Sequence, residues 1–444
     1  TLNNNKQDGS RLRQFLAYKL FNESGTVASR CNYAKVTVND EYLGVYSNVE
    51  PIKPPMLERG FGNGSGALFE GTLTDLFSDR IGRFESKTKA SKPADLQAVA
   101  EALEEEELDL VKLESMLDVE AFVRFWAMES LIGFWDGYTL NQNNFFIYRN
   151  PATATYCFIP WGTDSAFAAS APRFFDKVQI KSVHTQSVLG NRLYRDPEIR
   201  ELYRKTLVRF LSTVWNEEAL LAEVDRIESL IGDDVLERKS FRRDVARVRS
   251  FIKKRRRVME KELKRWPIPI TTGPREPIRI EEIGRAQATF NAEWSAKMPG
   301  KPDTRGEVEI DMIVDGAPVT FRRIGAAVRP DEESEAKVQI VLTGRRDSDR
   351  RKLRLNVSLD KASFRPTQKP VSVSGIVIEG NILAFVLRAI VHPLSLKFID
   401  GEATFEQAGM EPGAPVKGDL DLRIVKIAGG QATLRPNGVR APLR

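Results

Sequence analysis

Residues 133–168 carry the side chains of this 444-residue chain that are best suited to chemistry. Asp136 opens a loop that is rich in amides, at Asn141, Asn143 and Asn144, and Asp164 lies in a second loop just after a Pro-Trp pair. Carboxylate and amide oxygens are the ligands of hard cations, and Mg²⁺ usually binds one or two carboxylates together with phosphate oxygens. The segment therefore predicts a site for a divalent cation and a phosphate-bearing molecule.

The order of these residues matches the parts of a protein-kinase catalytic site. In such a site an Asp orients or deprotonates the acceptor hydroxyl, a nearby Asn holds a metal ion, and a short hairpin leads to a metal-binding Asp. Asp136 and Asn141 have the kinase spacing of five positions, and Asp164 follows two strand-like runs. Because Asp and Asn are also common turn residues, the spacing alone also allows a purely structural loop.

The composition argues against several other kinds of site. The only histidines, His184 and His392, stand far apart, so His-based zinc sites and Ser-His or Cys-His catalysis are not expected. The two cysteines, Cys31 and Cys157, allow either one bridge between neighbouring strands or two buried free thiols. A net charge of +6 is too mild to indicate nucleic acid binding, and no apolar run is long enough to span a membrane.

The elements that must position the site follow from hydrophobic periodicity. Helical spacing predicts a first helix over residues 10–21 with Asp8 and Ser10 as N-cap candidates, because short polar side chains satisfy the first N–H groups of a helix. The other elements expected before residue 266 are a hairpin from 33–38 and 42–49, a helical region over 93–134, a second hairpin from 144–148 and 156–161, and helices over 196–263.

The second part of the chain has a different pattern. Prolines at positions 267, 269 and 274 end the helices and predict a linker over residues 267–277. Short alternating runs, separated by Gly, Asp and Pro turns, then predict an all-β sandwich of antiparallel strands over residues 278–444. We therefore expect an α+β first domain over residues 1–266, followed by the linker and a β-sandwich domain.

Several separated motifs of the first domain stand in a characteristic order. They are TLNNNKQDGSRLRQFLAYKLF, VTVNDEYLGVYSNVE, the segment from Asp136 that ends in NNFFIY, IPWGTDSAF and FIKKRRRVMEKEL. Over roughly residues 1–265 they resemble the CotH-type atypical kinases of bacterial spore coats and related exported proteins. The resemblance implies a kinase-like fold that transfers a phosphoryl group from ATP to Ser or Thr of a coat or surface protein, with Mg²⁺ or Mn²⁺. It also implies an exported protein, whose signal peptide is not within this sequence. From the mild charge we expect no nucleic acid partner.

The resemblance assigns roles to individual residues. Asp136 matches the acceptor-side catalytic Asp, and Asp164 matches the metal-binding acid. The metal-binding asparagine is either Asn141, from the kinase spacing, or Asn144, from the family's Asn directly before an aromatic-rich strand. Glu50, which ends the VYSNVE strand, would lie near the hinge that faces adenine; without the resemblance it is a solvated acid at a strand end.

The sequence departs from the family pattern in three places. Gly162 stands where many relatives have the first acid of an Asp-x-Asp pair, and Phe69-Glu70 stands where a strand often ends in Tyr-Lys. The sequence also starts inside the family's domain, so that the lysine-bearing strands expected to contact the phosphates are not part of it. These departures leave an alternative open, in which the first domain is a catalytically inactive scaffold of an exported adhesion protein.

Overall fold

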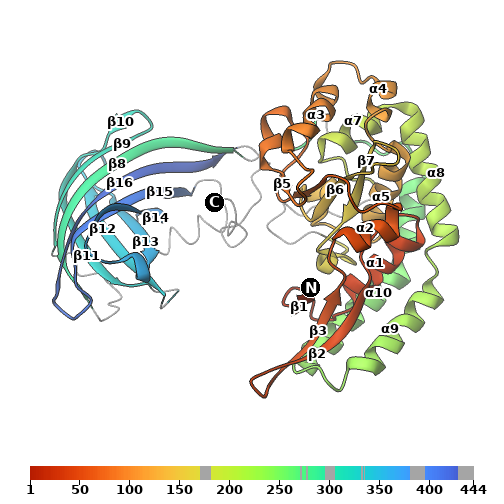
Figure 1. Cartoon of the computed structure of the whole chain (residues 1–444), viewed down its shortest axis with the longest axis horizontal. Helices are drawn as coiled ribbons and strands as arrows, with labels where there is room; N and C mark the ends of the chain where they lie inside the picture. Colours follow the sequence, from red (N-terminus) through yellow and green to blue (C-terminus); the bar gives the residue numbers. More distant parts are fainter. Residues whose placement is uncertain are drawn as a thin grey trace. The chain divides into compact units, whose positions relative to one another are not determined.

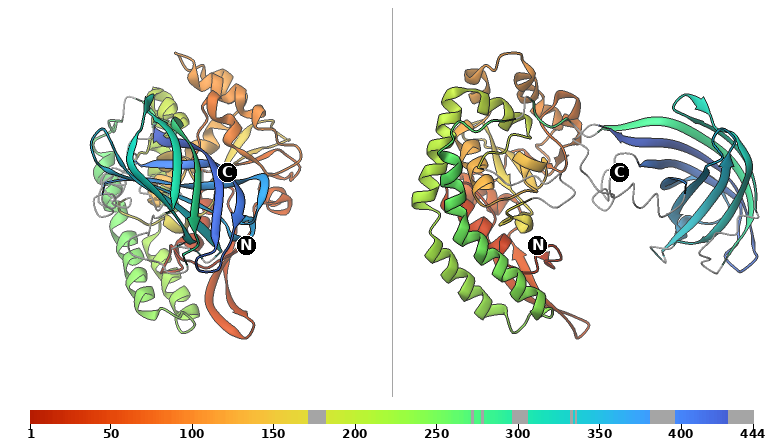
Figure 2. Two further views of the ribbon diagram at one scale, coloured as in Figure 1. Left: turned by 90° about the vertical axis from the view of Figure 1, so that its left-hand side faces the viewer. Right: turned by 180° about the vertical axis from the view of Figure 1, so that it is seen from behind.

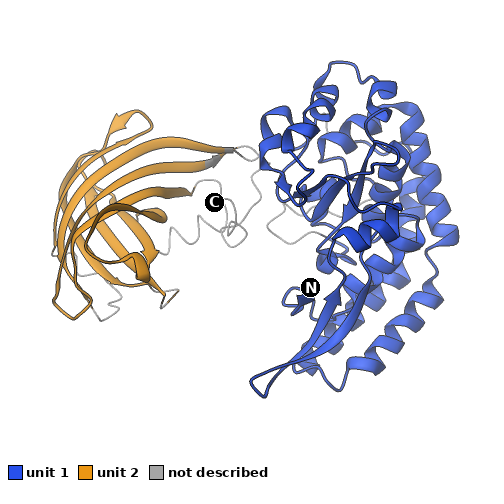
Figure 3. Cartoon of the chain, viewed as in Figure 1, with its two compact units in different colours: residues 1–277 blue, residues 278–444 orange. Residues whose placement is uncertain are grey.

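The computed structural model describes residues 1–170, 182–270, 273–276, 279–295, 306–331, 334, 336–380 and 396–428. The chain forms two compact units, Thr1–Pro277 and Ile278–Arg444 (Figure 3). Helices and antiparallel strands are both abundant, which confirms the predicted α+β class (Figure 1). His392 and the chain beyond residue 428 lie outside the described residues.

The first sheet of unit 1 joins the start of the chain to the predicted hairpin. Its strands β1 (Leu2–Asn3), β3 (Glu41–Val49) and β2 (Cys31–Val38) are antiparallel, in the order β1-β3-β2. The hairpin turns at Asn39 and Asp40, which both have a positive φ, a conformation that Asn and Asp tolerate better than other side chains. The hairpin prediction is confirmed.

The second sheet of unit 1 has four strands in the order β5-β4-β6-β7. These strands are β5 (Glu85–Ser86), β4 (Leu68–Gly71), β6 (Phe145–Arg149) and β7 (Tyr156–Pro160), and all neighbours are antiparallel. The predicted second hairpin is β6 and β7. Phe145 and Phe158 stack on each other and, with Phe122 and Tyr138, join this sheet to the core of the unit.

The helices of unit 1 begin where a polar side chain or a proline supplies a start. Asp118, Ser187 and Asn216 each accept a hydrogen bond from an N–H group of the first turn, and Pro197 opens a further helix. The helices are α1 (Arg13–Glu23), α2 (Pro54–Phe61), α3 (Gln97–Glu104), α4 (Leu110–Glu114), α5 (Val119–Leu131), α6 (Tyr138–Asn141), α7 (Val188–Arg195), α8 (Pro197–Thr213), α9 (Glu217–Ile231) and α10 (Arg238–Leu263).

Two helical predictions need correction. The region predicted as helical over 93–134 is divided into a 3-10 turn, α3, α4 and α5, because the run Glu104–Glu107 places four like charges together, and Asp109 then starts a new helix as its N-cap. The first helix begins at Arg13 and not at residue 10. The three helices α8, α9 and α10 follow one another in the sequence and line one side of unit 1, as the view from behind in Figure 2 shows.

Unit 2 consists of antiparallel strands, as predicted, but hydrogen bonds join its described strands into one continuous sheet that curls, in place of two facing sheets. The order is β10-β9-β8-β16-β15-β14-β13-β12-β11. The bounds are β8 (Arg279–Glu293), β9 (Glu307–Val314), β10 (Ala317–Pro318), β11 (Phe321–Pro330), β12 (Lys337–Arg346), β13 (Lys352–Asp360), β14 (Thr367–Glu379), β15 (Lys397–Ala408) and β16 (Pro415–Ala428). Alternate residues of these strands point into one apolar core, for example Leu353, Leu355 and Val357.

The segment predicted as a linker packs against unit 1. Trp266 stacks on Tyr203 with 6.2 Å between the ring centroids, and the backbone N–H of Ile268 donates to the Tyr194 hydroxyl over 2.9 Å. The side chain of Ile268 is buried in the core of unit 1, and the partly buried Ile270 packs against the same core. The chain passes into unit 2 only after Pro277. Among the described residues, no helix has both the length and the apolar character that a membrane span requires.

Candidate functional site

Asp136 lies at the centre of the amide-rich loop between α5 and β6. Its Oδ1 accepts hydrogen bonds from the side-chain amides of Asn141 over 2.6 Å and of Asn143 over 3.1 Å, and its Oδ2 accepts one from Asn144 over 2.9 Å. The Asn144 amide also donates to the backbone oxygen of Asp136 over 3.0 Å. The structure therefore brings together the predicted catalytic acid and both candidate asparagines.

Local backbone geometry explains how the loop reaches this arrangement. Gln142 and Asn144 have φ values of +50° and +54°, so the chain turns sharply twice between α6 and β6. The backbone N–H of Trp161 then donates to the Asn144 oxygen over 3.0 Å, which ties the loop to the end of β7. Burial raises the pKa of Asp136, although the three asparagines and the charge of Arg275 act to lower it.

Two buried acids hold the short helix α6 beneath this loop. Glu129 accepts hydrogen bonds from the backbone N–H groups of Tyr138 and Thr139, both over 2.8 Å. Asp75 accepts from the Tyr138 hydroxyl over 2.7 Å and from the backbone N–H of Val188 over 2.8 Å. Burial raises the pKa of Glu129 to about 7 and that of Asp75 to about 6. Sequence reasoning missed both acids: Asp75 lies 63 positions from Tyr138, and Glu129, only nine positions before it, falls within the apolar pattern of α5.

Asp164 occupies a 3-10 turn, Thr163–Ser165, directly after β7. Burial, and after it the negative charge of Asp8, raises the pKa of Asp164 to about 6; the Asn3 side chain opposes this change, and the charge of Asp136 adds to it. The charge of Asp136 is thus one of the smaller causes that disfavour the ionised form of Asp164. A divalent cation bound at Asp164 would favour the ionised form.

Gly162 joins the two loops. It has a φ of +53°, and a Cβ atom at this position would lie 2.7 Å from Oδ1 of Asn144. The amide oxygen of Asn144 therefore faces the turn that carries Asp164. The oxygen of Asn141 is engaged elsewhere, since Nη1 of Arg275 donates to it over 3.0 Å.

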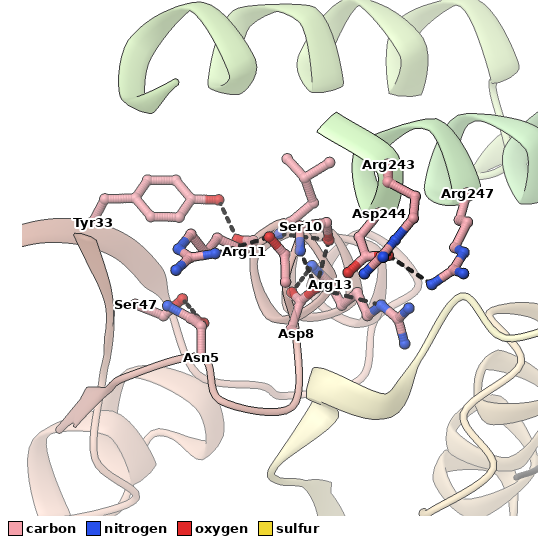
Figure 4. Close-up of polar contacts among 12 residues, drawn as sticks. Asn5, Asp8, Ser10, Arg11, Arg13, Tyr33, Ser47, Arg243, Asp244 and Arg247 are labelled. Atoms are coloured by element: carbon pink, nitrogen blue, oxygen red, sulfur yellow. Dashed lines mark hydrogen bonds and ion pairs between the residues drawn. The ribbon is translucent and has the colours of Figure 1, made fainter. Parts of the chain in front are cut away.

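The loop before α1 supplies further polar groups near Asp164. Asp8 accepts hydrogen bonds from the backbone N–H groups of Ser10 over 3.0 Å and of Arg13 over 2.9 Å, and Ser10 Oγ accepts one from the Leu12 N–H over 3.3 Å (Figure 4). The N-cap residue of α1 is Leu12, so neither predicted candidate occupies that position, although Asp8 accepts from the first N–H of the helix, that of Arg13. Asp8 and Asn3 are further acidic and amide groups near Asp164 that the sequence did not identify as part of the site, although they lie in the first motif of the family.

Glu50 lies apart from these residues. Its carboxylate accepts from Nη2 of Arg30 and from Nη2 of Arg59, each over 2.8 Å. Partial burial acts to raise its pKa, but the hydrogen bonds from the two arginines prevail and lower it. In the described part of the chain, the side chains that bind Glu50 are those of Arg30, which precedes β2, and Arg59, in α2. Neither is one of the predicted site residues.

The two cysteines and the described histidine, His184, lie outside the proposed site. Cys31 and Cys157 are free thiols in different sheets, and burial raises the pKa of both to about 12. His184 is buried, and burial lowers its pKa to about 3, so that it is neutral. No group of three His, Cys, Asp or Glu side chains is placed to hold a metal ion anywhere in the described ranges. A cation at the Asp164 turn would thus depend on carboxylate and amide oxygens, a donor set that fits Mg²⁺.

Unit 1 is therefore an α+β domain in which Asp136 precedes the β6–β7 hairpin and Asp164 follows it. Residues 1–259 match the sequence model of a family described as CotH kinase protein. This match covers more than half of the 444 residues, and the chain belongs to the CotH family. The resemblance inferred from the motifs is confirmed.

Curated relatives are similar to the same part of the chain. Inner spore coat protein H of Bacillus subtilis is 24% identical over 256 residues, which are 52% of this chain and 68% of that protein. Invasin CotH2 of Rhizopus delemar is 22% identical over 257 residues, 52% of this chain and 43% of that protein. Spore coat protein homolog 1 of the same organism is 24% identical over 238 residues, 48% of this chain and 38% of that protein. The chain thus spans less than half the length of these two Rhizopus relatives.

Proposed function

We propose that unit 1 is an ATP-dependent protein kinase of the CotH type, which transfers a phosphoryl group to Ser or Thr. The observation that carries this proposal is the position of Asp136, which is held by three asparagines, one of which, Asn144, also faces the turn that carries Asp164. Phosphoryl transfer depends mainly on positioning and on charge neutralisation, and this arrangement supplies groups for both.

Asp136 would act on the acceptor hydroxyl. A carboxylate has about four lone-pair sites, and three side-chain amides occupy three of them, two on Oδ1 and one on Oδ2. The remaining site on Oδ2 can accept the hydrogen bond of a Ser or Thr hydroxyl. As the hydroxyl oxygen bonds to the γ-phosphorus and the bond from that phosphorus to the ADP oxygen breaks, the hydroxyl proton passes to Asp136.

Asp164 and Asn144 would hold the divalent metal, Mg²⁺ or Mn²⁺. Asn144 is favoured over Asn141 because its Oδ1 faces the Gly162 turn, whereas Oδ1 of Asn141 accepts from Arg275. When bound, the metal neutralises phosphate charge. Gly162 supplies no carboxylate, so Asp164 is the acid from this turn. Glu50, which is paired with Arg30 and Arg59, would contact adenine only if one of these pairs opened.

The acceptor would be a protein of a coat or cell surface. The relatives named inner spore coat protein H and invasin CotH2 support this location and substrate class, and export of this chain is part of the same proposal. We propose no nucleic acid partner.

Transfer of labelled phosphate from ATP to a mixture of surface proteins tests the proposal. The full chain should label an acceptor in the presence of Mg²⁺, and Asp136→Ala and Asp164→Ala should each lower the rate by at least about 100-fold, as for loss of a catalytic acid or base. Glu120→Ala is the matched control, because Glu120 is exposed on α5, the helix that precedes Asp136. Equal labelling by all four proteins would reject the assigned roles. Binding of ATP without transfer would favour the scaffold alternative.

A further inference from the structure

The segment that follows α10 extends unit 1 beyond the part of the chain that matches the family. The match ends at residue 259, but Trp266 and Ile268 pack on Tyr194 and Tyr203, as described above. The chain then returns to the site, where the backbone N–H of Arg275 donates to the oxygen of Gln186 over 2.7 Å. The backbone N–H of Gln186 in turn donates to the oxygen of Thr139 in α6. Arg275 is thereby fixed beside the amide-rich loop.

The guanidinium group of Arg275 donates two hydrogen bonds to one residue of that loop, Asn141. Nη1 donates to the side-chain oxygen of Asn141 over 3.0 Å, and Nη2 donates to its backbone oxygen over 2.7 Å. The side-chain nitrogen of Asn141 then donates to Oδ1 of Asp136 over 2.6 Å. These bonds form a continuous chain from the arginine through the amide to the carboxylate. Each hydrogen bond in such a chain polarises the next.

The positive charge of Arg275 also acts on Asp136. Burial lowers the pKa of Arg275 to about 10, and the carboxylates of Asp75 and Asp136 oppose that change, so the guanidinium remains charged at neutral pH. It is therefore a fixed positive charge beside two acids of the site. Its fork of N–H groups also selects one orientation of the Asn141 amide, the one that presents nitrogen to Asp136.

We propose that Arg275 is a positioning residue of the active site, which acts through Asn141 to hold Asp136 in its working orientation. The inference rests on the proposed kinase function and extends it, because it makes the connecting segment up to residue 276 a part of the functional unit. It also gives Asn141 a role other than metal binding: its side-chain oxygen accepts from Arg275, and its side-chain nitrogen donates to Asp136.

Full-length variants at position 275 test this role. Arg275→Ala should lower kcat for phosphate transfer by about 10- to 100-fold, because misplacement of a reacting group by about 1 Å costs up to about 100-fold, while KM for ATP changes by less than about twofold. Arg275→Lys keeps the charge without the fork and should recover part of the lost kcat. Arg265→Ala is the control, since Arg265 is an exposed arginine in the same segment, and its kcat should equal that of the wild type. An unchanged kcat in Arg275→Ala would overturn the proposal.

A second measurement does not depend on activity. Amide hydrogen exchange of residues 137–144 should become faster in Arg275→Ala than in Arg265→Ala, whereas exchange in α8 should be the same in both. If the wild type transfers no phosphate, the kinase proposal fails, and the exchange result still decides whether Arg275 orders the loop. Identical exchange in the two variants would refute the positioning role. Uniformly faster exchange across unit 1 would refute it too, because the arginine would then only stabilise the fold.

Discussion

The carboxylate of Asp136 receives its side-chain hydrogen bonds from neutral amides. Three asparagines donate to it, and Arg275 reaches it only through Asn141. Amides fix the direction of a carboxylate without fully neutralising it, and burial raises its pKa, so the group retains the basicity that proton acceptance requires. An arginine in direct contact would have held the carboxylate equally well but would have weakened it as a base.

The two candidate asparagines should therefore respond differently to substitution. Asn144→Ala removes the oxygen that faces the Asp164 turn, and we expect the Mg²⁺ concentration for half-maximal transfer to rise by about 10-fold or more, as for loss of a group that supports a metal. Asn141→Ala should lower kcat and leave the Mg²⁺ requirement nearly unchanged. Titration of activity with Mg²⁺ separates the two effects. If Asn141→Ala has the larger effect on the Mg²⁺ requirement, the kinase spacing identified the ligand and our assignment is wrong.

Gly162 cannot simply be returned to the Asp of the family pattern. Its φ of +53° costs a residue with a Cβ atom about 1–2 kcal/mol, and the new Cβ would lie 2.7 Å from Asn144 Oδ1. We expect Gly162→Asp to lower the free energy of unfolding by about 2–3 kcal/mol and to leave transfer no faster. Gly62→Asp is the control: Gly62 has a φ of +72° with open space around it, so only the backbone cost of about 1–2 kcal/mol applies. If urea unfolding shows the same loss of unfolding free energy for both variants, Asn144 can move away from the new side chain without an energetic cost, and the prediction is wrong.

At the scale of elements, the helix α6 is a single turn that is held by buried acids and not by its own length. Isolated helices of this length are unstable, because the conformational entropy lost in forming the first turn exceeds the free energy gained from its hydrogen bond. The carboxylate of Glu129 replaces the missing partners of two N–H groups at its start, and Asp75 fixes the Tyr138 ring. The loop that carries Asp136 thus depends on side chains contributed by α5 and by the segment after β4.

This dependence predicts a pH effect. Burial raises the pKa of Glu129 from 4.5 to about 7, so between these values the folded protein binds a proton that the unfolded chain has lost. The free energy of unfolding of the wild type should therefore fall as pH rises from 5 to 8, and Glu129→Gln, which cannot titrate, should lack this part of the slope. The difference in stability between the two proteins should change by on the order of 2–3 kcal/mol over this range. Urea unfolding at both pH values measures it. Glu120→Gln, on the exposed face of the same helix, should follow the wild type, and parallel curves for Glu129→Gln would contradict the prediction.

The elements that the sequence predicted well are those with local signals. The two hairpins of unit 1 follow from alternation and turn residues. The proposed site residues Asp136, Asn141, Asn144 and Asp164 were likewise selected from their place between such elements. Glu129, Asp75 and Arg275 could not be found in this way. Asp75 lies 63 positions from Tyr138, and Arg275 lies 134 positions from Asn141, so only the fold brings them together. Arg275 also stood in a proline-rich stretch, where proline spacing is typical of a linker.

At the scale of the whole molecule, the apolar clusters among the described residues each belong to one unit only, two of them to unit 1 and one to unit 2. The main core of unit 1 is built from residues between Leu12 and Ile268, and that of unit 2 from residues between Ala286 and Ile424. Burial of apolar surface is the main source of stability, and the buried residues of these two clusters come from different units, so each unit should unfold as its own cooperative block.

Matched leucine substitutions in the full chain test this independence. Leu207 in α8 and Leu422 in β16 are both fully buried, one in each core. Leu→Ala at such sites costs about 2–5 kcal/mol, which for units of this size lowers the transition temperature by roughly 5–15 °C. Calorimetry of the wild type should resolve two transitions; Leu207→Ala should lower one of them and Leu422→Ala the other. Because the site lies wholly in unit 1, phosphate transfer should be lost on heating together with the transition that Leu207→Ala moves. A single transition that both substitutions lower equally would mean that the two cores unfold together, and the site could then not be treated as a property of unit 1 alone.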